Sequence, residues 1–309
     1  MPYNDLYRRQ VSLLVRVLPF VADEKCFALK GGTAINLFIR DMPRLSVDID
    51  LTYLPVQSRP ESLKEIDTAM KRIAEDATSV SPAENITPAS PNKEGAVTKL
   101  IARGDGVQIK IEVTPVLRGC VFEPEERTVR QAVEESFGYA EMQVVSFADL
   151  YGGKIVAALD RQHPRDLFDV RDLLANEGIS QELRQAFIVY LLSHDRPMHE
   201  VIRPTRKDIL QDYERGFEGM TDQIVTLEEL TQAREALIRE VIGNMPDDHR
   251  SFLISFERGE PDWPLLGLQH ASELPAVQWR QLNLDKLNDE ARSNLVKELE
   301  RKLNEAAGS

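Results

Sequence analysis

The sequence predicts an α+β protein, with a mixed sheet core in residues 1–145 and a helical domain in residues 146–309. One observation is the strict alternation of apolar and polar residues from Val107 to Val113, which is typical of a half-buried strand. A second is a short strand pattern, Asp48 to Leu51, that follows a helical pattern. The third is that the apolar spacing becomes helical from Ser146 onward. These patterns place the strands in the first half of the chain.

The first half is expected to open with a helix and to contain two more. The helix within residues 1–24 should end at Pro19, and its apolar positions are Val11, Leu14, Val15 and Leu18. A second helix should start near Thr33, with apolar positions at Ala34, Leu37 and Phe38. A third lies near residues 58–77, and the segment from Ser81 to Pro91, which contains three prolines, predicts a surface loop.

The second half carries signals for helix starts and ends. Ser146 and Asp149 resemble a capping box, and Gly178 is placed to end a later helix. The segment Thr226–Glu229 is a capping box that opens a helix to about Asn244, and a last amphipathic helix spans Leu287 to Leu303. Between these two helices the chain is irregular, and we expect its two tryptophans, Trp263 and Trp279, to hold helices together.

Two aspartates stand two residues apart in the short strand. Asp48 and Asp50 share one face because successive side chains of a strand alternate, which leaves Ile49 on the core face. Two neighbouring carboxylates repel each other unless a cation lies between them. Mg²⁺ suits such a pair, with Mn²⁺ as the alternative ion, because it binds carboxylate oxygens and keeps positions for phosphates. A solvated strand face is the simpler reading of the same pattern.

A glycine pair precedes these aspartates. Gly31 and Gly32 permit a tight turn, and the helix that starts near Thr33 offers backbone N–H groups and the positive end of its dipole to a phosphate. An ordinary strand-to-helix turn would look the same. In this order, however, the phosphate-binding turn and the metal-binding strand together favour chemistry on a nucleoside triphosphate.

A third carboxylate fits the same site. Gln108, Lys110 and Glu112 lie on the polar face of the alternating strand. If this strand lies beside the first, Glu112 joins Asp48 and Asp50 around one or two metal ions, which in two-metal sites lie about 3.5–4 Å apart. The alternative is that Lys110 and Glu112 only face solvent.

A lysine and two acids stand out in the helical half. Lys154 lies near the middle of a helix among small residues, so that a ligand could approach it: Gly152, Gly153, Ala157 and Ala158. In the next helix Asp166 and Asp169 share a face because they are three residues apart. The plainer alternatives are a lysine that reaches solvent along its helix and two surface acids that complement a helix dipole.

Three blocks resemble the AbiEii/AbiGii family, whose close relatives include the MenT toxins. The blocks are Lys30–Ala34, Arg44–Leu51 and Asp149–Lys154 with its continuation Arg165–Asp169, and the resemblance covers roughly residues 25–175. It implies a polymerase-β-like nucleotidyltransferase fold with Thr33 in place of the usual serine. It also implies that Gly31, Gly32, Thr33 and Lys154 hold the triphosphate, that Asp48, Asp50 and Glu112 bind metal, and that Asp169 is an essential acid.

The resemblance also implies a function. Members of the family are toxins of bacterial toxin–antitoxin and phage-defence modules, so we expect a cognate antitoxin as partner. The implied reaction adds nucleotides from a nucleoside triphosphate to an RNA acceptor, the 3′ end of tRNA, which blocks translation. Two alternatives stay open: transfer to a protein hydroxyl or a small molecule, and a module that binds nucleotide or a partner chain without catalysis. The residue pattern favours catalysis because every acid and the lysine that the chemistry requires are present.

Composition limits these possibilities. With 42% hydrophobic residues among 309, wholesale disorder is excluded. Two cysteines, Cys26 and Cys120, without zinc spacing or a signal peptide predict reduced thiols and a cytoplasmic protein, and no apolar run approaches the ~20 residues of a membrane helix. The net charge of −13 has the wrong sign for a broad nucleic-acid binder. An RNA acceptor would need a local basic group, and the candidates are Arg118, Arg127 and Arg130, or Arg203, Arg206 and Lys207.

Overall fold

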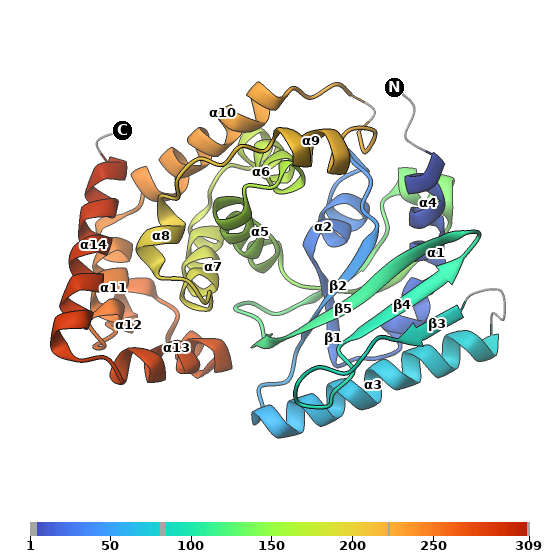
Figure 1. Cartoon of the computed structure of the whole chain (residues 1–309), viewed down its shortest axis with the longest axis horizontal. Helices are drawn as coiled ribbons and strands as arrows, with labels where there is room; N and C mark the ends of the chain where they lie inside the picture. Colours follow the sequence, from blue (N-terminus) through green and yellow to red (C-terminus); the bar gives the residue numbers. More distant parts are fainter. Residues whose placement is uncertain (1–4, 81–84, 222, 308–309) are drawn as a thin grey trace. The chain divides into compact units, whose positions relative to one another are not determined.

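The computed structural model describes residues 5–80, 85–221 and 223–307. The chain divides into two compact units, Met1–Ser146 with Glu218–Ile224, and Phe147–Phe217 with Val225–Ser309. The short return segment belongs to the first unit because the backbone N–H of Leu45 donates to the carbonyl of Met220 at 2.7 Å. The first unit carries the sheet, and the long helices that follow Ser146 form the second (Figure 1).

Seven strands in the described residues form one sheet with the order β3-β4-β5-β2-β1-β7-β6. Their bounds are β1 Phe27–Lys30, β2 Asp48–Tyr53, β3 Asn85–Pro88, β4 Lys99–Gly104, β5 Val107–Arg118, β6 Glu125–Thr128 and β7 Glu141–Val144. Strands β2 and β5 are parallel, as are β1 and β7, whereas the other neighbours are antiparallel. The sheet is therefore mixed, as predicted.

The alternation predicted for Val107 to Val113 is confirmed in β5. Its apolar residues, from Val107 through Ile111 to Val113, are buried, while Gln108 and Lys110 are exposed. Helices α1 (Asp5–Ala22) and α3 (Arg59–Val80) contact each other and strands β4 and β5 (Figure 1). The apolar side chains of β5 thus belong to the core, which leaves the opposite face to the polar ones.

At two prolines the secondary structure differs from the prediction. Helix α1 continues past Pro19 to Ala22, because the apolar contacts of its last turn, including fully buried Val21, outweigh the missing N–H group. The predicted loop Ser81–Pro91 contains strand β3, and its residues 81–84 lie outside the described residues. Pro88 is tolerated there because β3 is an edge strand with a partner, β4, on one side.

The helix after the glycine pair has an unusual form. It starts as α2 (Gly31–Thr33) and continues as a π-helical segment, Ala34–Ile39. The N–H of Arg40 donates to the carbonyl of Ile35 at 2.8 Å, which is the wider spacing of a π-helix. Helix α4, Gln131–Phe137, completes the described helices of the first unit.

The second unit is helical in its described residues. The α-helices are α5 Phe147–Arg161, α6 Pro164–Asn176, α7 Gln181–Leu192, α8 Met198–Ile202, α9 Leu210–Gly216, α10 Leu227–Ile238, α11 Asp247–Glu257, α12 Trp263–Leu266, α13 Pro275–Asp285 and α14 Asp289–Ala307. A π-helical segment, Arg239–Gly243, extends α10, and a 3₁₀ turn, Gln269–Glu273, precedes α13. None of the described helices combines the length and the apolar character that a membrane-spanning helix needs.

The predicted helix signals are largely confirmed. Thr226 and Glu229 form the capping box of α10, with the Thr226 N–H donating to Glu229 Oε2 at 2.6 Å. Gly178 has a left-handed φ of 69° and donates its N–H to the carbonyl of Leu173, which closes α6.

The two tryptophans behave differently from each other. Trp263 is buried, and its ring centroid lies 5.0 Å from that of Phe252, so it holds α11 and α12 together. Trp279 is 59% exposed on α13, and the prediction that it joins helices is wrong. Its ring instead lies beside the Lys286 ammonium, 5.3 Å from the centroid, at the end of the same helix.

Candidate active site

The register of the sheet collects charged residues in one row. Lys30 of β1 is paired with Asp50 of β2, and Asp50 is paired in turn with Glu112 of β5. Glu112 is also paired with Lys99 of β4. Because directly paired residues of neighbouring strands share a face, the four side chains form one row across β1, β2, β5 and β4, with a lysine at each end and the two acids between them.

The glycine turn lies against the aspartate strand. Gly31 has a φ of 74°, and a Cβ added to it would lie 2.6 Å from Asp50 Oδ2, which is too close for any side chain. A Cβ on Gly32 would lie 2.7 Å from Arg44 Nη2 and 3.1 Å from Ser46 Oγ. The two glycines are therefore needed for the close approach between the turn and the side chains of the Arg44–Leu51 motif.

Thr33 joins the same two elements. Its side chain is 1% exposed, its hydroxyl donates to the backbone carbonyl of Asp48, and its Oγ1 lies 3.0 Å from the hydroxyl oxygen of Ser46. These contacts hold the start of the helix against the start of β2. The role of Thr33 in triphosphate binding stays a prediction.

Lys30 is a residue of this site to which the sequence assigned no role. Burial lowers the pKa of its ammonium, while the charge of Asp50 acts in the opposite direction. Lys30 is the last residue of β1 and directly precedes Gly31, and this position beside the glycine turn could have indicated that it belongs to the site. Its pairing with Asp50 could not be inferred, because the order of β1 and β2 in the sheet is not a local property.

Glu112 lies beside Asp50, but its carboxylate has a second partner. Lys99 Nζ lies 2.6 Å from Glu112 Oε1. Within the described residues, no three His, Cys, Asp or Glu side chains gather closely enough to hold a metal ion. The chemistry of Asp48 and Asp50, two carboxylates on one strand face, fits a hard divalent cation. Glu112 is paired with Asp50 in the sheet, so its strand position fits a role as a third metal ligand. The contact that its carboxylate makes in the structure is the ion pair with Lys99.

A second charged cluster lies in the second unit and is buried. Lys154 Nζ on α5 lies 2.9 Å from Asp166 Oδ1 and 3.1 Å from Asp169 Oδ2, both on α6. Lys154 is 8% exposed, Asp166 3% and Asp169 1%. The alternative interpretation of these residues, as a solvent-reaching lysine and surface acids, is therefore wrong.

Asp166 is the member of this cluster to which the sequence assigned no role. Arg161 Nη2 lies 2.8 Å from Asp166 Oδ2, so this carboxylate contacts two cations. Burial by itself would raise the pKa of Asp166, but the charges of Lys154 and Arg161 outweigh it and lower the pKa to about 2. Asp166 is therefore a carboxylate at all physiological pH values.

The small residues beside Lys154 serve helix packing. A Cβ on Gly152 would lie 2.9 Å from the backbone nitrogen of Phe187, and one on Gly153 would lie 3.2 Å from the ring of Tyr190. Helix α7 thus occupies the space that we expected to be open to a ligand next to these glycines. The same packing places the Tyr190 hydroxyl 3.1 Å from Asp149 Oδ1, to which it donates.

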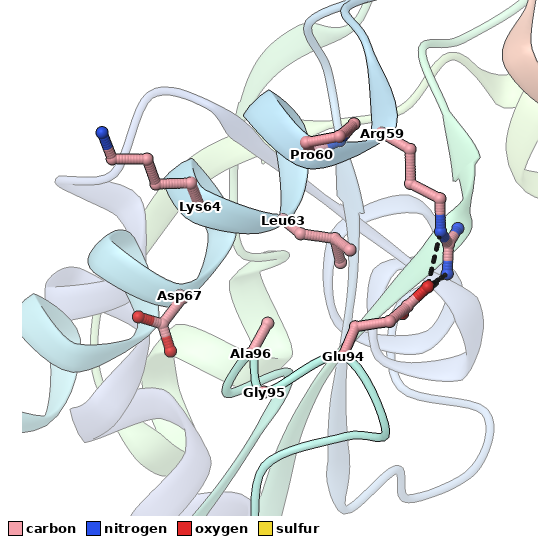
Figure 2. Close-up of a pocket in the computed structure, with 8 residues that line it drawn as sticks. All are labelled: Arg59, Pro60, Leu63, Lys64, Asp67, Glu94, Gly95 and Ala96. Carbon is pink, nitrogen blue, oxygen red and sulfur yellow. Dashed lines mark hydrogen bonds and ion pairs between the residues drawn. The ribbon is translucent and has the colours of Figure 1, made fainter.

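A separate cavity of about 440 Å³ lies in the first unit and contains none of the predicted site residues. It lies between the start of α3 and the segment 94–96 (Figure 2). Arg59 bridges the two sides, since its Nε and Nη2 atoms each lie 2.8 Å from an oxygen of Glu94 (Figure 2). Asp67 and Lys64 line it as well, so its charges of opposite sign balance.

Comparisons with known proteins show the family and the fold of the chain. The family model of the "Nucleotidyl transferase AbiEii toxin, Type IV TA system" matches residues 12–280. Among solved structures, the chain is similar to MenT4, a nucleotidyltransferase toxin from Mycobacterium tuberculosis H37Rv, with a TM-score of 0.57 and 15% identity over 90% of this chain and 93% of that chain. A comparison with curated proteins gives no match. The fold is thus that of a MenT nucleotidyltransferase toxin, and the chain belongs to the AbiEii family of nucleotidyltransferase toxins from type IV toxin–antitoxin systems.

Proposed function

We propose that this nucleotidyltransferase is metal-dependent and transfers nucleotides to an RNA acceptor, the 3′ end of tRNA, so that translation stops. Family membership implies the nucleoside triphosphate substrate and an antitoxin partner. The observation that carries the proposal is the close approach of the two motifs: no side chain fits between Gly31 and the carboxylate of Asp50. A phosphate held at the turn would therefore lie next to the metal-binding carboxylates.

Asp48 and Asp50 would hold the divalent cation, Mg²⁺ or Mn²⁺. Glu112 would complete the metal site, and its carboxylate would then leave Lys99 and bind the metal. The pairing of Glu112 with Asp50 in the sheet supports this role. The chemistry that such a cation supplies is activation of the acceptor hydroxyl and neutralisation of charge on the phosphates and the leaving pyrophosphate.

The remaining residues would position the triphosphate. Gly31 and Gly32 let the backbone approach a phosphate at the start of the helix, where N–H groups favour an anion. Thr33 holds this turn against β2 through its bond to the Asp48 carbonyl. Lys30 balances the charge of Asp50, with which it is paired, and so keeps that carboxylate in place when no cation is bound.

Lys154 and Asp169, which belong to the second unit, also have proposed roles. We propose that Lys154 binds the triphosphate as a point charge and that Asp169 orients its ammonium group. The ion pair at 3.1 Å supports the second role. Lys154→Met removes the charge at similar length and Lys154→Arg retains it, so weaker nucleotide binding in the first variant and partial recovery in the second are expected.

The direct test uses the four labelled nucleoside triphosphates, each with total tRNA and with a protein extract. We expect label on tRNA, at its 3′ end, with one or two of the nucleotides, and release of pyrophosphate. Label found only on protein would refute the RNA acceptor and favour the alternative of transfer to a protein hydroxyl.

The metal-binding role is tested by Asp48→Asn and Asp50→Asn. Each should lower the transfer rate at least about 100-fold, the scale seen when one group that stabilises transition-state charge is removed. Asp105→Asn is the matched control, because Asp105 is an exposed acid of the same unit that pairs with Arg16. Unchanged toxicity in a bacterial host with Asp48→Asn would show that catalysis is not the function.

A further inference from the structure

Four arginines line one cavity of the second unit. The cavity has a volume of about 390 Å³, and its charged lining residues are Arg203, Arg206, Arg234, Arg239 and Glu235. They come from the segment after α8, from α10 and from the π-helical segment that follows it. Three of the arginines have carboxylate partners: Arg203 lies 3.4 Å from Glu305, Arg234 lies 2.5 Å from Glu235 and Arg239 lies 3.3 Å from Glu240. Four arginines and three carboxylates leave a local charge of +1 in a chain whose net charge is −13. The cavity, called the arginine cavity below, is therefore a local basic site on an acidic protein.

Hydrogen bonds connect the residues of one wall of this cavity. Arg234 is 5% exposed, and its Nε donates to Gln162 Oε1 at 2.9 Å while its Nη2 donates to the carbonyl of Pro204. Gln162 also donates to the carbonyl of Thr205 at 2.8 Å and accepts from the N–H of Lys207 at 3.1 Å. The segment 204–207 is thus tied to buried Gln162 at Thr205 and Lys207 and to Arg234 at Pro204, and this segment provides one wall.

The mouth of the cavity carries arginines that can reach a ligand. Arg206 is exposed, and its contact to the hydroxyl of Thr231 is long, at 3.5 Å. In the part of the chain that the structure describes, no carboxylate lies within ion-pair distance of Arg206. Arg239 is exposed as well and lies 3.3 Å from its sequence neighbour Glu240. Exposed guanidinium groups can donate paired hydrogen bonds to the oxygens of a phosphate.

Two of the three arginines in the other basic group singled out in the sequence are engaged within the protein. Arg118 is buried and its Nη1 donates to the hydroxyl of Ser62 at 3.2 Å. Arg127 lies 2.6 Å from Glu125 on the same strand. A polyanion approaching a protein of net charge −13 is repelled at long range, so it needs a local attraction of the kind that the arginine cavity provides.

We propose that the arginine cavity binds a backbone phosphate of the RNA acceptor. This inference rests on the proposed function, because it assumes an RNA acceptor. The cavity is also linked to the charged cluster of α5 and α6: Gln162 follows Arg161, which pairs with Asp166 at 2.8 Å. A free phosphate or a nucleoside triphosphate shares this chemistry, and the test separates these ligands from RNA.

The test compares Arg206→Ala/Arg239→Ala with the control Arg9→Ala/Arg103→Ala. The control removes the same charge from exposed arginines of the first unit, whose guanidinium groups donate to neutral oxygens of Asp105 and Thr87. The probe is fluorescein-labelled total tRNA, with binding measured by fluorescence anisotropy at several salt concentrations. Tryptophan emission spectra of each variant check that the second unit is folded.

For the cavity variant we expect tRNA binding to weaken about tenfold. The slope of log affinity against log salt should also fall by about 1 for each RNA phosphate that the variant no longer binds. The control should bind within about twofold of the wild type. In the transfer assay the KM for tRNA should rise while kcat is retained, because a contact to a backbone phosphate contributes to RNA binding and not to the chemical step.

Two outcomes overturn the proposal, and a third refutes only the proposed function. Equal tRNA binding by the two double variants would show that the cavity does not bind RNA. An increased KM for the nucleoside triphosphate, or weaker binding of inorganic phosphate, with unchanged tRNA binding would assign the cavity to a free phosphate ligand instead. If wild-type protein binds tRNA through the cavity but adds no nucleotide to it, the RNA site stands and the proposed acceptor function fails.

Discussion

Replacement of Asp166 by asparagine tests the buried charged cluster of α5 and α6. The substitution keeps the shape of the side chain and removes its charge. Asp169 remains 3.1 Å from Lys154, so the ammonium group keeps one carboxylate partner and the variant should fold. The expected result is a less stable second unit at neutral pH, with a defined dependence on pH.

The magnitude follows from the pKa of Asp166. Burial would raise it, but the charges of Lys154 and Arg161 lower it from its ordinary value of 3.8 to about 2. Since each tenfold change in a dissociation constant is worth about 1.4 kcal/mol, this shift corresponds to about 2 kcal/mol of folding free energy. The stabilisation is present above the unfolded-state pKa of 3.8, and it disappears as the pH falls from there toward 2.

Tryptophan fluorescence measures the unfolding of this unit alone. Both tryptophans of the chain, Trp263 and Trp279, belong to the second unit, and Trp263 is buried, so its emission changes when the unit unfolds. Urea unfolding at pH 7 should give a free energy of unfolding about 2 kcal/mol lower for Asp166→Asn than for the wild type. At pH 2 the two proteins should differ little.

The control is Asp247→Asn, in which an exposed acid in the first turn of α11 is changed. Removal of its interaction with the helix dipole should cost no more than about 1 kcal/mol. The reasoning is refuted if Asp166→Asn is as stable as the wild type at pH 7, or if the difference between them persists unchanged at pH 2.

Two further predictions concern the glycine turn and a buried acid. Gly31→Ala should lower both stability and transfer activity more than Gly95→Ala, because both positions have a left-handed φ but only a Cβ at residue 31 would overlap Asp50. Circular dichroism in urea and the transfer assay measure the difference, and equal effects would contradict the close approach. Burial raises the pKa of Glu257, against the opposing charge of Arg280 at 3.8 Å, so its carboxylate destabilises the fold as the pH rises above 4.5. Glu257→Gln should therefore be more stable than the wild type at pH 7 by tryptophan-monitored unfolding, and a less stable variant there would contradict this sign.

Local patterns predicted the elements well where the local preference and the tertiary contacts agree. The alternation from Val107 to Val113 predicted β5, and the Thr226–Glu229 pair predicted the start of α10, because both signals act within a few residues. Pro19 and Pro88 misled the prediction. In both cases packing or an edge position in the sheet removed the cost of the missing N–H group.

The residues of the candidate site were largely visible in the sequence, but their partners were not. Asp48 and Asp50 follow from strand periodicity. The pairing of Asp50 with Lys30 on one side and Glu112 on the other depends on strand order, which brings together segments that are separate in the chain. Asp166 was visible as a helix acid, and its ion pair with Lys154 depends on how α5 and α6 pack.

By itself, then, the sequence determined the types of group available: a glycine turn that opens a helix, a pair of carboxylates on one strand face, and a lysine with two acids on successive helices. Periodicity and turn residues are sufficient for this because they are short-range properties of the chain. Only the tertiary structure decided which charges meet. It set Asp50 against Gly31 and beside Lys30, and it collected four arginines around one cavity. Strand register and helix packing are set by burial of the whole core, and no local stretch of sequence contains that information.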